Sequence, residues 1–435
     1  MTILHFWVLI SIAFTVILFR IALPGKDTSL TSVRRFTLPV VFLLALIIRV
    51  ITAKGSQGFG ADIGCFSAWA DRMVEIGPSG FYSPDYFSDY PPLYLYLLYF
   101  VGFFRKMLNL EHYSPLHMLL LKTPAILSDL GIGYYLYRIT RKHMGIASAL
   151  AIASIFLFQP VVIMNSCLWG QIDSVYTLFL LILCLFLEKR QILPAFLVFG
   201  AGVLLKPQIL IFSPLLIIGI LLFLFEKNSS AKGAFLKKYF LVLGYALLTL
   251  ILMLLAASPF GLQNVLSQYF STLESYPYVS VNAYNFWTAV GLNWYSQNVV
   301  FLGLPCTVWG TMAIVLAAVI CILLGLHFKD LPEKYALAGA FLILSVFCFS
   351  VRMHERYLYP AIPLLLTALP GLASRQLVLS SYPGQDRERV GLLTPALHYF
   401  YPFLFVAITS LHFYNTAHIL FFYDPLTYSG SAPIL

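Results

Sequence analysis

Long apolar runs recur along the whole chain, and short polar segments separate them. An α-helix needs about 17 to 25 mainly apolar residues to cross the hydrocarbon layer of a membrane, and most of these runs have that length. The strands of a membrane barrel would instead alternate apolar and polar residues over about ten positions, a pattern that is not seen here. The pattern therefore predicts an all-α, polytopic transmembrane protein of about 12 spans.

The ends of the apolar runs give the expected boundaries of the membrane-spanning helices. Residues 91–104 are the difficult segment, because counting them as a full crossing would move every later basic loop to the outer side. We therefore expect a partial or interface-parallel helix there, anchored by Tyr90, Tyr94, Tyr96 and Tyr99 at the headgroups. The expected spans are residues 3–23, 36–53, 117–137, 146–165, 174–187, 193–205, 209–225, 239–257, 299–326, 335–351, 357–372 and 397–420.

With these spans, the basic loops all fall on one side of the membrane, which the positive-inside rule makes the cytoplasmic side. The N-terminus then faces out, and the two larger loops, 54–116 and 258–298, lie on the outer side. No Pro/Gly linker separates a soluble part. We therefore expect one integral-membrane domain over residues 1–435.

Composition supports this class and excludes others. Hydrophobic residues make up 60% of the chain, charged residues 10%, and the mean hydropathy is +0.85, values that no ordinary water-soluble globule has. The net charge of +9 comes mostly from short inter-helix loops, so it predicts no nucleic-acid partner. The six cysteines form no CxxC pair, which indicates small buried side chains and neither a disulfide framework nor a metal site.

Acidic residues cluster in the first outer loop. Asp62, Asp71, Glu75, Asp85 and Asp89 lie there, in a chain with only 18 acidic residues. A carboxylate at a membrane surface can accept the proton of a reacting hydroxyl, and the glycines before Asp62 would allow close backbone approach. The alternatives are a solvated loop carboxylate for Asp62 and a helix cap for Asp89, which precedes two prolines.

Polar residues also interrupt the apolar segments, where they are costly unless they are paired or line a cavity. Lys122 and Asp129 fall within one expected helix and would have either a structural or a substrate-binding role. Lys206 could reach the interface as a flexible side chain or face a lipid-linked phosphate. The candidate binding residues of these breaks are Trp169, Gln171 and Asp173, then Lys206 and Gln208.

Two later segments add further candidates. Asn285 and Trp287 belong to an aromatic and amide-rich stretch that would suit a sugar, or would simply lie at the membrane interface. The segment 352–356 is more unusual, because four ionisable residues stand between two apolar runs. Such a set is typical of a phosphate site with a tuned imidazole, the alternative being a plain loop. Its members are Arg352, His354, Glu355 and Arg356.

The collinear order of these segments resembles the GT-C superfamily of polyprenyl-phosphate-sugar glycosyltransferases, over about residues 58–360. It is similar to the dolichyl-phosphate-glucose-dependent glucosyltransferases of N-glycan assembly, and more similar to prokaryotic relatives of the mannosyltransferases that build GPI anchors. A departure is Arg352-Met353, where the glucosyltransferases have a longer His-containing string. The matching positions are Asp62, Asp89 to Leu93, Ser128-Asp129, Lys206, Asn285 to Trp287, and His354 to Arg356.

The resemblance implies an inverting transfer of a hexose, mannose or glucose, from a polyprenyl-phosphate carrier to a hydroxyl acceptor. It implies Asp62 as the general base, His354, Glu355 and Arg356 beside the donor, and Lys206 at the equivalent polar break. It implies no metal or cofactor. The expected partners are the lipid-linked donor, a glycan or protein hydroxyl and membrane lipids, and the expected location is the outer face of a prokaryotic plasma membrane rather than the endoplasmic reticulum.

Three other functions compete with this interpretation. A transporter or lipid flippase would line a path between both faces with charges, and commonly shows an inverted repeat, which is not visible here. A ligase or polymerase with a diphosphate-linked donor would carry arginine in the large outer loop, yet residues 258–298 contain no Lys or Arg. A non-enzymatic assembly protein would tolerate replacement of Asp62.

Overall fold

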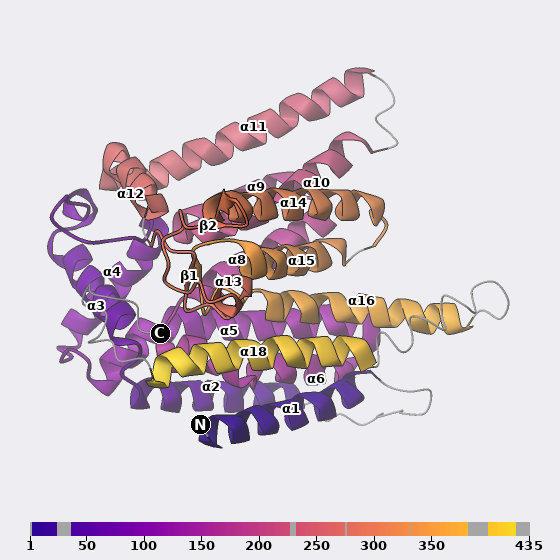
Figure 1. The fold of residues 1–435 in the computed structure, drawn as a ribbon, viewed down its shortest axis with the longest axis horizontal. Helices are drawn as coiled ribbons and strands as arrows, with labels where there is room; N and C mark the ends of the chain where they lie inside the picture. The colour runs from indigo at the N-terminus through magenta and orange to yellow at the C-terminus, as the bar shows by residue number, and fades with distance from the viewer. Residues whose placement is uncertain are drawn as a thin grey trace.

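The structure is a computed structural model that describes residues 2–23, 36–226, 232–274, 276–331, 333–381 and 399–422. Long helices run in roughly the same direction along its longest axis, and α11 diverges from the others (Figure 1). The all-α fold predicted from the apolar pattern is confirmed. The long helices are α1 (Thr2–Ala22), α2 (Thr37–Gly55), α5 (Pro115–Met144), α6 (Ile146–Leu157), α8 (Asp173–Glu188), α9 (Ile192–Leu205), α10 (Ser213–Leu224), α11 (Lys232–Ala257), α14 (Cys306–His327), α15 (Lys334–Phe349), α16 (Ala361–Ser381) and α18 (Tyr401–Phe422).

Within the described ranges, six helices are long and apolar enough to cross a membrane by themselves, and a bent helix pair would make seven. Shorter apolar helices, among them α9 and α15, lie in the same bundle (Figure 1). These two helices have 14 and 16 residues, fewer than the roughly 20 that cross the hydrocarbon layer. The length criterion therefore counts fewer spans than the expected number of about 12.

The expected single span 146–165 is instead broken. Helix α6 ends at Leu157, and α7 (Pro160–Ile163) starts a segment that is bent by 49° from it. Pro160 has no backbone N–H and cannot continue the preceding helix. The chain then forms a π-helix, η2 (Met164–Trp169), and leaves it through Gly170 in the left-handed conformation. A polar break at this position was predicted, but its π-helical form was not.

Two helices form a separate layer at one end of the bundle, α3 (Gly60–Glu75) and α4 (Pro92–Met107), joined through η1 (Pro78–Gly80) (Figure 1). Gly102 makes their close contact possible, because a Cβ there would lie 2.3 Å from the Ala70 carbonyl oxygen. Among the described helices, α4 is not one of the candidate spans. Its place beside α3 agrees with the partial helix expected for residues 91–104.

The second outer loop lies at the same end of the bundle (Figure 1). Asn415 of α18 holds it, since its amide accepts from the Tyr284 N–H at 2.9 Å and donates to the Asn282 carbonyl at 2.6 Å. The shorter elements of this end are η3 (Pro207–Phe212), η5 (Ser258–Phe260), α12 (Leu262–Glu274), β1 (Ser280–Val281), α13 (Phe286–Ala289), β2 (Val300–Phe301), β3 (Leu304–Pro305) and β4 (Met353–His354).

Strand β1 pairs in parallel with β4, with Ser280 opposite Met353 and Val281 opposite His354. Strands β2 and β3 form a short antiparallel hairpin. The parallel pair joins the second outer loop to the basic segment that follows α15. Two distant polar segments of the sequence thus become one surface.

Lys122 and Asp129, for which the sequence leaves two roles open, both make structural contacts. The Lys122 ammonium donates to the carbonyls of Ala53 and Ser56, at 3.2 and 2.7 Å, at the C-terminal end of α2. A cation at that end satisfies carbonyls that have no helical partner. Asp129 bonds Arg49 inside the bundle at 3.0 Å. Neither side chain lines the cavity described next.

Candidate active site

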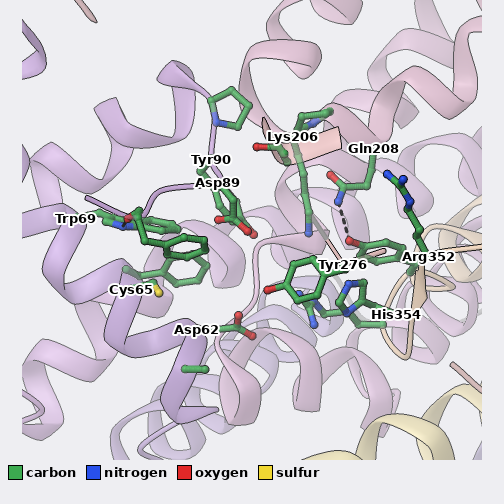
Figure 2. A pocket seen from close by; sticks show the side chains of 18 residues that line it. Asp62, Cys65, Trp69, Asp89, Tyr90, Lys206, Gln208, Tyr276, Arg352 and His354 are labelled. Carbon is green, nitrogen blue, oxygen red and sulfur yellow. Dashed lines mark hydrogen bonds between the residues drawn. The ribbon is translucent and has the colours of Figure 1, made fainter. Parts of the chain in front are cut away.

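A cavity of about 350 Å³ opens at the end of the bundle where α3, α4 and α12 lie (Figure 2). Its walls come from α3, from the segment before α4, from the junction of α9 and η3, from α12 and from the turn after β4. Phe66, Trp69, Phe87, Tyr90, Tyr276 and Tyr357 give it an aromatic lining. The residues predicted from sequence that line it are Asp62, Asp89, Lys206, Gln208, Arg352, His354 and Arg356.

Asp62 lies in the first turn of α3 and faces the cavity (Figure 2). The Trp169 indole N–H donates to one of its carboxylate oxygens at 2.6 Å, and this bond fixes the orientation of the carboxylate. Gly58 makes that contact possible, because a Cβ there would meet the Trp169 carbonyl oxygen at 2.9 Å. The expected close approach is thus confirmed at Gly58, whereas a Cβ on Gly60 would meet nothing.

Asp89 lies across the cavity from Asp62 (Figure 2). Burial, with a smaller contribution from the Asp62 carboxylate, raises the pKa of Asp89 to about 6, against the opposing effects of Arg356 and Lys206. It does not cap α4, whose N-cap is Pro91 and which has no side-chain capping bond. The carboxyl is therefore available to the cavity, and its pKa is close to neutral pH.

Lys206 ends α9 and points into the cavity, but its charge is already balanced. Its ammonium lies 2.5 Å from the carboxylate of Asp173, which also accepts from the Asn165 amide at 2.9 Å. Rings of Tyr90, Tyr176 and Tyr357 lie 5.4 to 6.0 Å from the ammonium. Desolvated charges are stable only when paired in this way, so Asp173 holds the Lys206 ammonium at the cavity wall from behind the lining.

Arg356 is mostly buried, with 13% of its side chain exposed, and it lies among carboxylates and aromatic rings. Its guanidinium donates to Glu355 at 2.8 Å, and its Nε lies 4.0 Å from Asp173. The ring of Trp169 lies 5.7 Å from the guanidinium carbon. Burial acts to lower the pKa of Arg356, but the carboxylates of Asp62 and Glu355 outweigh it, so the pKa lies well above its ordinary value.

His354 and Glu355 are both buried beside this arginine. Burial, followed by the charges of Arg356 and Lys206, lowers the pKa of His354 well below its usual range, so the imidazole is neutral at pH 7. The ring of Tyr276 packs edge-on against it, with centroids 5.0 Å apart. Burial raises the pKa of Glu355. His354 lines the cavity, whereas Glu355 lies behind Arg356.

Arg352 differs from the other two cations of the cavity. Its Nε donates to the neutral Gln297 amide at 2.6 Å, and the ion pairs found among the described residues do not include it. Its φ of 63° is left-handed, and its N–H donates to the Tyr278 carbonyl at 3.1 Å. The second outer loop therefore sets the position of this guanidinium, which has a net positive charge to offer an anion.

Six predicted residues lie outside the cavity lining, namely Glu355, Trp169, Gln171, Asp173, Asn285 and Trp287. Trp169 and Asp173 support Asp62 and Lys206 from behind, and Gln171 accepts from the Tyr90 hydroxyl at 3.3 Å. Asn285 and Trp287 lie elsewhere. Asn285 caps α13 by accepting from the Thr288 N–H at 3.1 Å, and both side chains donate to backbone carbonyls of α15. The loop contributes Tyr276 to the cavity instead.

Several cavity residues were not predicted as site residues from the sequence, chiefly Cys65, Phe66, Trp69, Tyr90, Tyr276 and Tyr357. A signal for two of them existed, since Phe66 and Trp69 follow Asp62 with the spacing of one helical face. Tyrosine is common at membrane interfaces, so the sequence offers no reason to place Tyr90 in a cavity.

Comparison with known proteins adds little to this geometry. No family model matches the chain, and no curated protein matches its sequence. Among solved structures, it is similar to ArnT from Cupriavidus metallidurans bound to undecaprenyl phosphate, with 12% identity and a TM-score of 0.48 over 89% of this chain and 78% of that chain. No residue role is carried over from a likeness of this degree. The fold and site define a polytopic α-helical membrane protein with a charged, aromatic-lined cavity at one end.

Proposed function

We propose that the chain is an integral membrane glycosyltransferase of the GT-C type. It moves a hexose, mannose or glucose, from a polyprenyl-phosphate carrier to a hydroxyl acceptor. One observation carries the proposal: polar segments that are far apart in the sequence supply carboxylates, cations and aromatic rings to one cavity at the end of an apolar bundle. A lipid carrier can keep its tail in the bilayer while its sugar and phosphate reach such a cavity.

Asp62 acts as the general base in this proposal. Its carboxylate accepts the proton of the acceptor hydroxyl while the hydroxyl oxygen attacks the anomeric carbon. The bond from that carbon to the phosphate oxygen breaks, and the phosphate leaves with the bonding electrons, so a single displacement inverts the anomeric centre. The Trp169 bond holds the base in place. Asp89, with its raised pKa, is the alternative base.

The positive charges favour a monophosphate donor. The charge of Lys206 is balanced by Asp173, and the charge of Arg356 is balanced by its ion pair with Glu355. Among the described residues, Arg352 has a neutral partner and no ion pair, so it provides the net charge for the leaving phosphate. A diphosphate would bring more negative charge than this arrangement balances. Electrostatic stabilisation of the leaving group by a well-placed donor is worth about 3 to 4 kcal/mol.

The aromatic rings would bind the sugar. Trp69, Tyr90, Tyr276 and Tyr357 line the same cavity as the carboxylates of Asp62 and Asp89. Basic residues such as Arg138, Arg141 and Arg190 lie at the ends of α5 and α8 away from the cavity. By the positive-inside rule they support an outward-facing cavity in a plasma membrane, for which we propose a prokaryotic host.

The proposal is tested with purified protein in detergent and EDTA, using a panel of short-chain polyprenyl-monophosphate sugars. We expect transfer of one sugar, and a fall in kcat of about 10² to 10⁴-fold in Asp62→Asn, with donor binding retained. Arg352→Ala should weaken donor binding instead.

Asp89→Asn is the matched comparison for Asp62→Asn. Normal turnover of Asp62→Asn beside an inactive Asp89→Asn would assign the base to Asp89. Folded protein that transfers no sugar from any monophosphate donor would contradict the donor class. Diphosphate donors would be assayed next, and then transport of the same lipids between the two leaflets of a vesicle.

A further inference from the structure

Polar groups from four separate elements meet inside the bundle, away from the cavity lining. Arg49 of α2 and Asp129 of α5 form an ion pair of 3.0 Å in which neither side chain is exposed. The Ser166 hydroxyl of η2 donates to Asp129 at 2.7 Å, and the Tyr359 hydroxyl, in the turn before α16, donates to its other carboxylate oxygen at 2.7 Å. We call this set the Asp129 cluster.

Two members of the Asp129 cluster belong to segments that carry the cavity. Ser166 precedes Trp169 by three residues in the same π-helix, and Trp169 is the donor that holds Asp62. Tyr359 follows Arg356 by three residues, and its backbone N–H donates to the Arg356 carbonyl at 3.1 Å. One carboxylate is therefore bonded to the segment behind Asp62 and to the turn that carries Arg356.

These segments need such an attachment. A π-helix is rare, forms mostly as a single turn and is found frequently at functional sites. The turn with Tyr359 lies between β4 and α16 and has no long helix of its own. Asp129 bonds both from α5, a helix of 30 residues packed in the bundle. Both oxygens of the Asp129 carboxylate accept hydrogen bonds, and a buried carboxylate satisfied in this way can fix one arrangement of its neighbours.

We propose that Asp129 is a positioning residue that holds Trp169 and Arg356 in the relative arrangement needed for transfer. This inference rests on the proposed function of the cavity. Asp129 touches no cavity residue that would meet substrate and acts only through Ser166 and Tyr359. A displacement of about 1 Å between reacting groups costs about 10²-fold in rate, so the attachment governs kcat more than substrate affinity.

Hydroxyl variants provide the test, because Asp129→Asn would leave the buried charge of Arg49 without its partner and is expected not to fold. Ser166→Ala and Tyr359→Phe each remove one hydroxyl that donates to Asp129, and both leave the ion pair intact. The control is Thr367→Val in α16, which removes another buried hydroxyl that donates to a backbone carbonyl at 2.7 Å. All three are compared as folded protein, by thermal unfolding in detergent.

We expect kcat to fall about 10- to 100-fold in Ser166→Ala and Tyr359→Phe, with the donor KM within twofold. Thr367→Val should lower the melting temperature about as much as the two hydroxyl variants do, but it should keep the wild-type kcat. The double variant should lose less than the product of the two single losses, because both act through Asp129. Equal kcat in Tyr359→Phe and Thr367→Val would overturn the proposal.

A second readout is independent of activity. Cys65 lines the cavity, so its rate of labelling by a small uncharged thiol reagent reports the cavity's shape, in a Cys348→Ser background. Tyr359→Phe should change this rate several-fold, and Thr367→Val should not. If the wild type transfers no sugar, the proposed function fails but the labelling still decides the role of Asp129. An unchanged labelling rate in both hydroxyl variants would overturn that role.

Discussion

At the scale of single residues, the role assigned to Lys206 depends on which side chain it pairs with. The sequence indicates a lysine in a polar break that could face a phosphate. The structure pairs it with Asp173, which is 33 residues earlier in the chain and itself a candidate binding residue. A pairing across two helices leaves no local signal in the sequence. The cavity cation without a carboxylate partner among the described residues is Arg352, and the residue type alone does not distinguish it from Arg356.

The Lys206–Asp173 pair leads to a stability prediction. Lys206→Met leaves Asp173 buried without its counter-charge and should lower the free energy of unfolding by about 3 to 5 kcal/mol. Lys206→Met with Asp173→Asn removes both charges and should recover most of that loss. Thermal or urea unfolding in detergent measures both variants. Additive losses in the double variant would show that the two charges do not depend on each other.

Asp89 leads to a prediction about pH. Its pKa of about 6 in the folded protein lies above the ordinary value of 3.8, so the folded state binds its proton more tightly than the unfolded state. Stability therefore falls as pH rises from about 4 to about 6, and the cost stays constant above that range. Asp89→Asn should remove a cost of about 3 kcal/mol at pH 7.

The measurement is the melting temperature of wild type and Asp89→Asn between pH 4 and pH 8. The variant should be the more stable protein at pH 7 to 8, and the difference should disappear toward pH 4. Asp85→Asn, in the same loop but exposed, is the control. A difference that is constant across the pH range would contradict the assigned pKa of Asp89.

At the scale of elements, one part of the layer formed by α3 and α4 was predictable in outline. The segment 91–104, expected to form a partial helix, corresponds to α4. The π-helix at residues 164–169 was not predictable, because a periodic pattern distinguishes apolar from polar residues and does not show where one residue is inserted in a turn. The parallel pairing of β1 with β4 joins segments of only two residues each, too short for any alternation to appear.

Gly102 tests the contact between α3 and α4. In Gly102→Ala the new methyl group would meet the backbone of Ala70, which cannot rotate away, so the helices must separate. We expect a loss of about 1 to 3 kcal/mol in the free energy of unfolding. Gly64→Ala, in α3, is the control, because nothing lies within 4 Å of its new Cβ. It should be neutral or stabilise the helix by up to about 1 kcal/mol.

Both variants also bear on activity, since α3 carries Asp62. Gly102→Ala should reduce transfer per folded molecule, whereas Gly64→Ala should not. Circular dichroism and thermal unfolding in detergent give the stabilities, and the sugar-transfer assay gives the activity. Equal behaviour of the two alanine variants would show that the close approach at Gly102 has no role in the layer.

At the scale of the whole molecule, the sequence was sufficient for the architecture and insufficient for the site. Apolar run lengths follow from the thickness of the hydrocarbon layer, so helices and their order can be read from one chain. The cavity depends on which helix ends meet, and that is decided by packing between distant segments. Asp62, Asp89, His354 and Arg356 line the cavity and could be singled out from the sequence because charges are rare in this chain. Trp69 and Tyr357 were missed because aromatic residues are common in it.

The long helices lie roughly along one axis (Figure 1), so each loop falls at one of the two ends of the bundle. The proposed orientation therefore predicts which loops are accessible from outside the cell. Asn298 and Lys189 are exposed and belong to loops at the outer and inner ends of the proposed arrangement. In a background with Cys65 and Cys348 replaced by Ser, Asn298→Cys should react with a membrane-impermeant thiol reagent in intact cells. Lys189→Cys should react only after the membrane is opened. Labelling of Lys189→Cys in intact cells would reverse the proposed orientation.

The attachment of the second outer loop to Asn415 has a consequence for how the protein is made. Residues 282–284 leave the ribosome long before α18, yet α18 supplies the two hydrogen bonds that hold them. The loop also carries Tyr276 and, through Gln297, the position of Arg352. A nascent chain therefore inserts most of its helices before the walls of the cavity are all in position. Chains released early by a premature stop codon would occupy the membrane without becoming active.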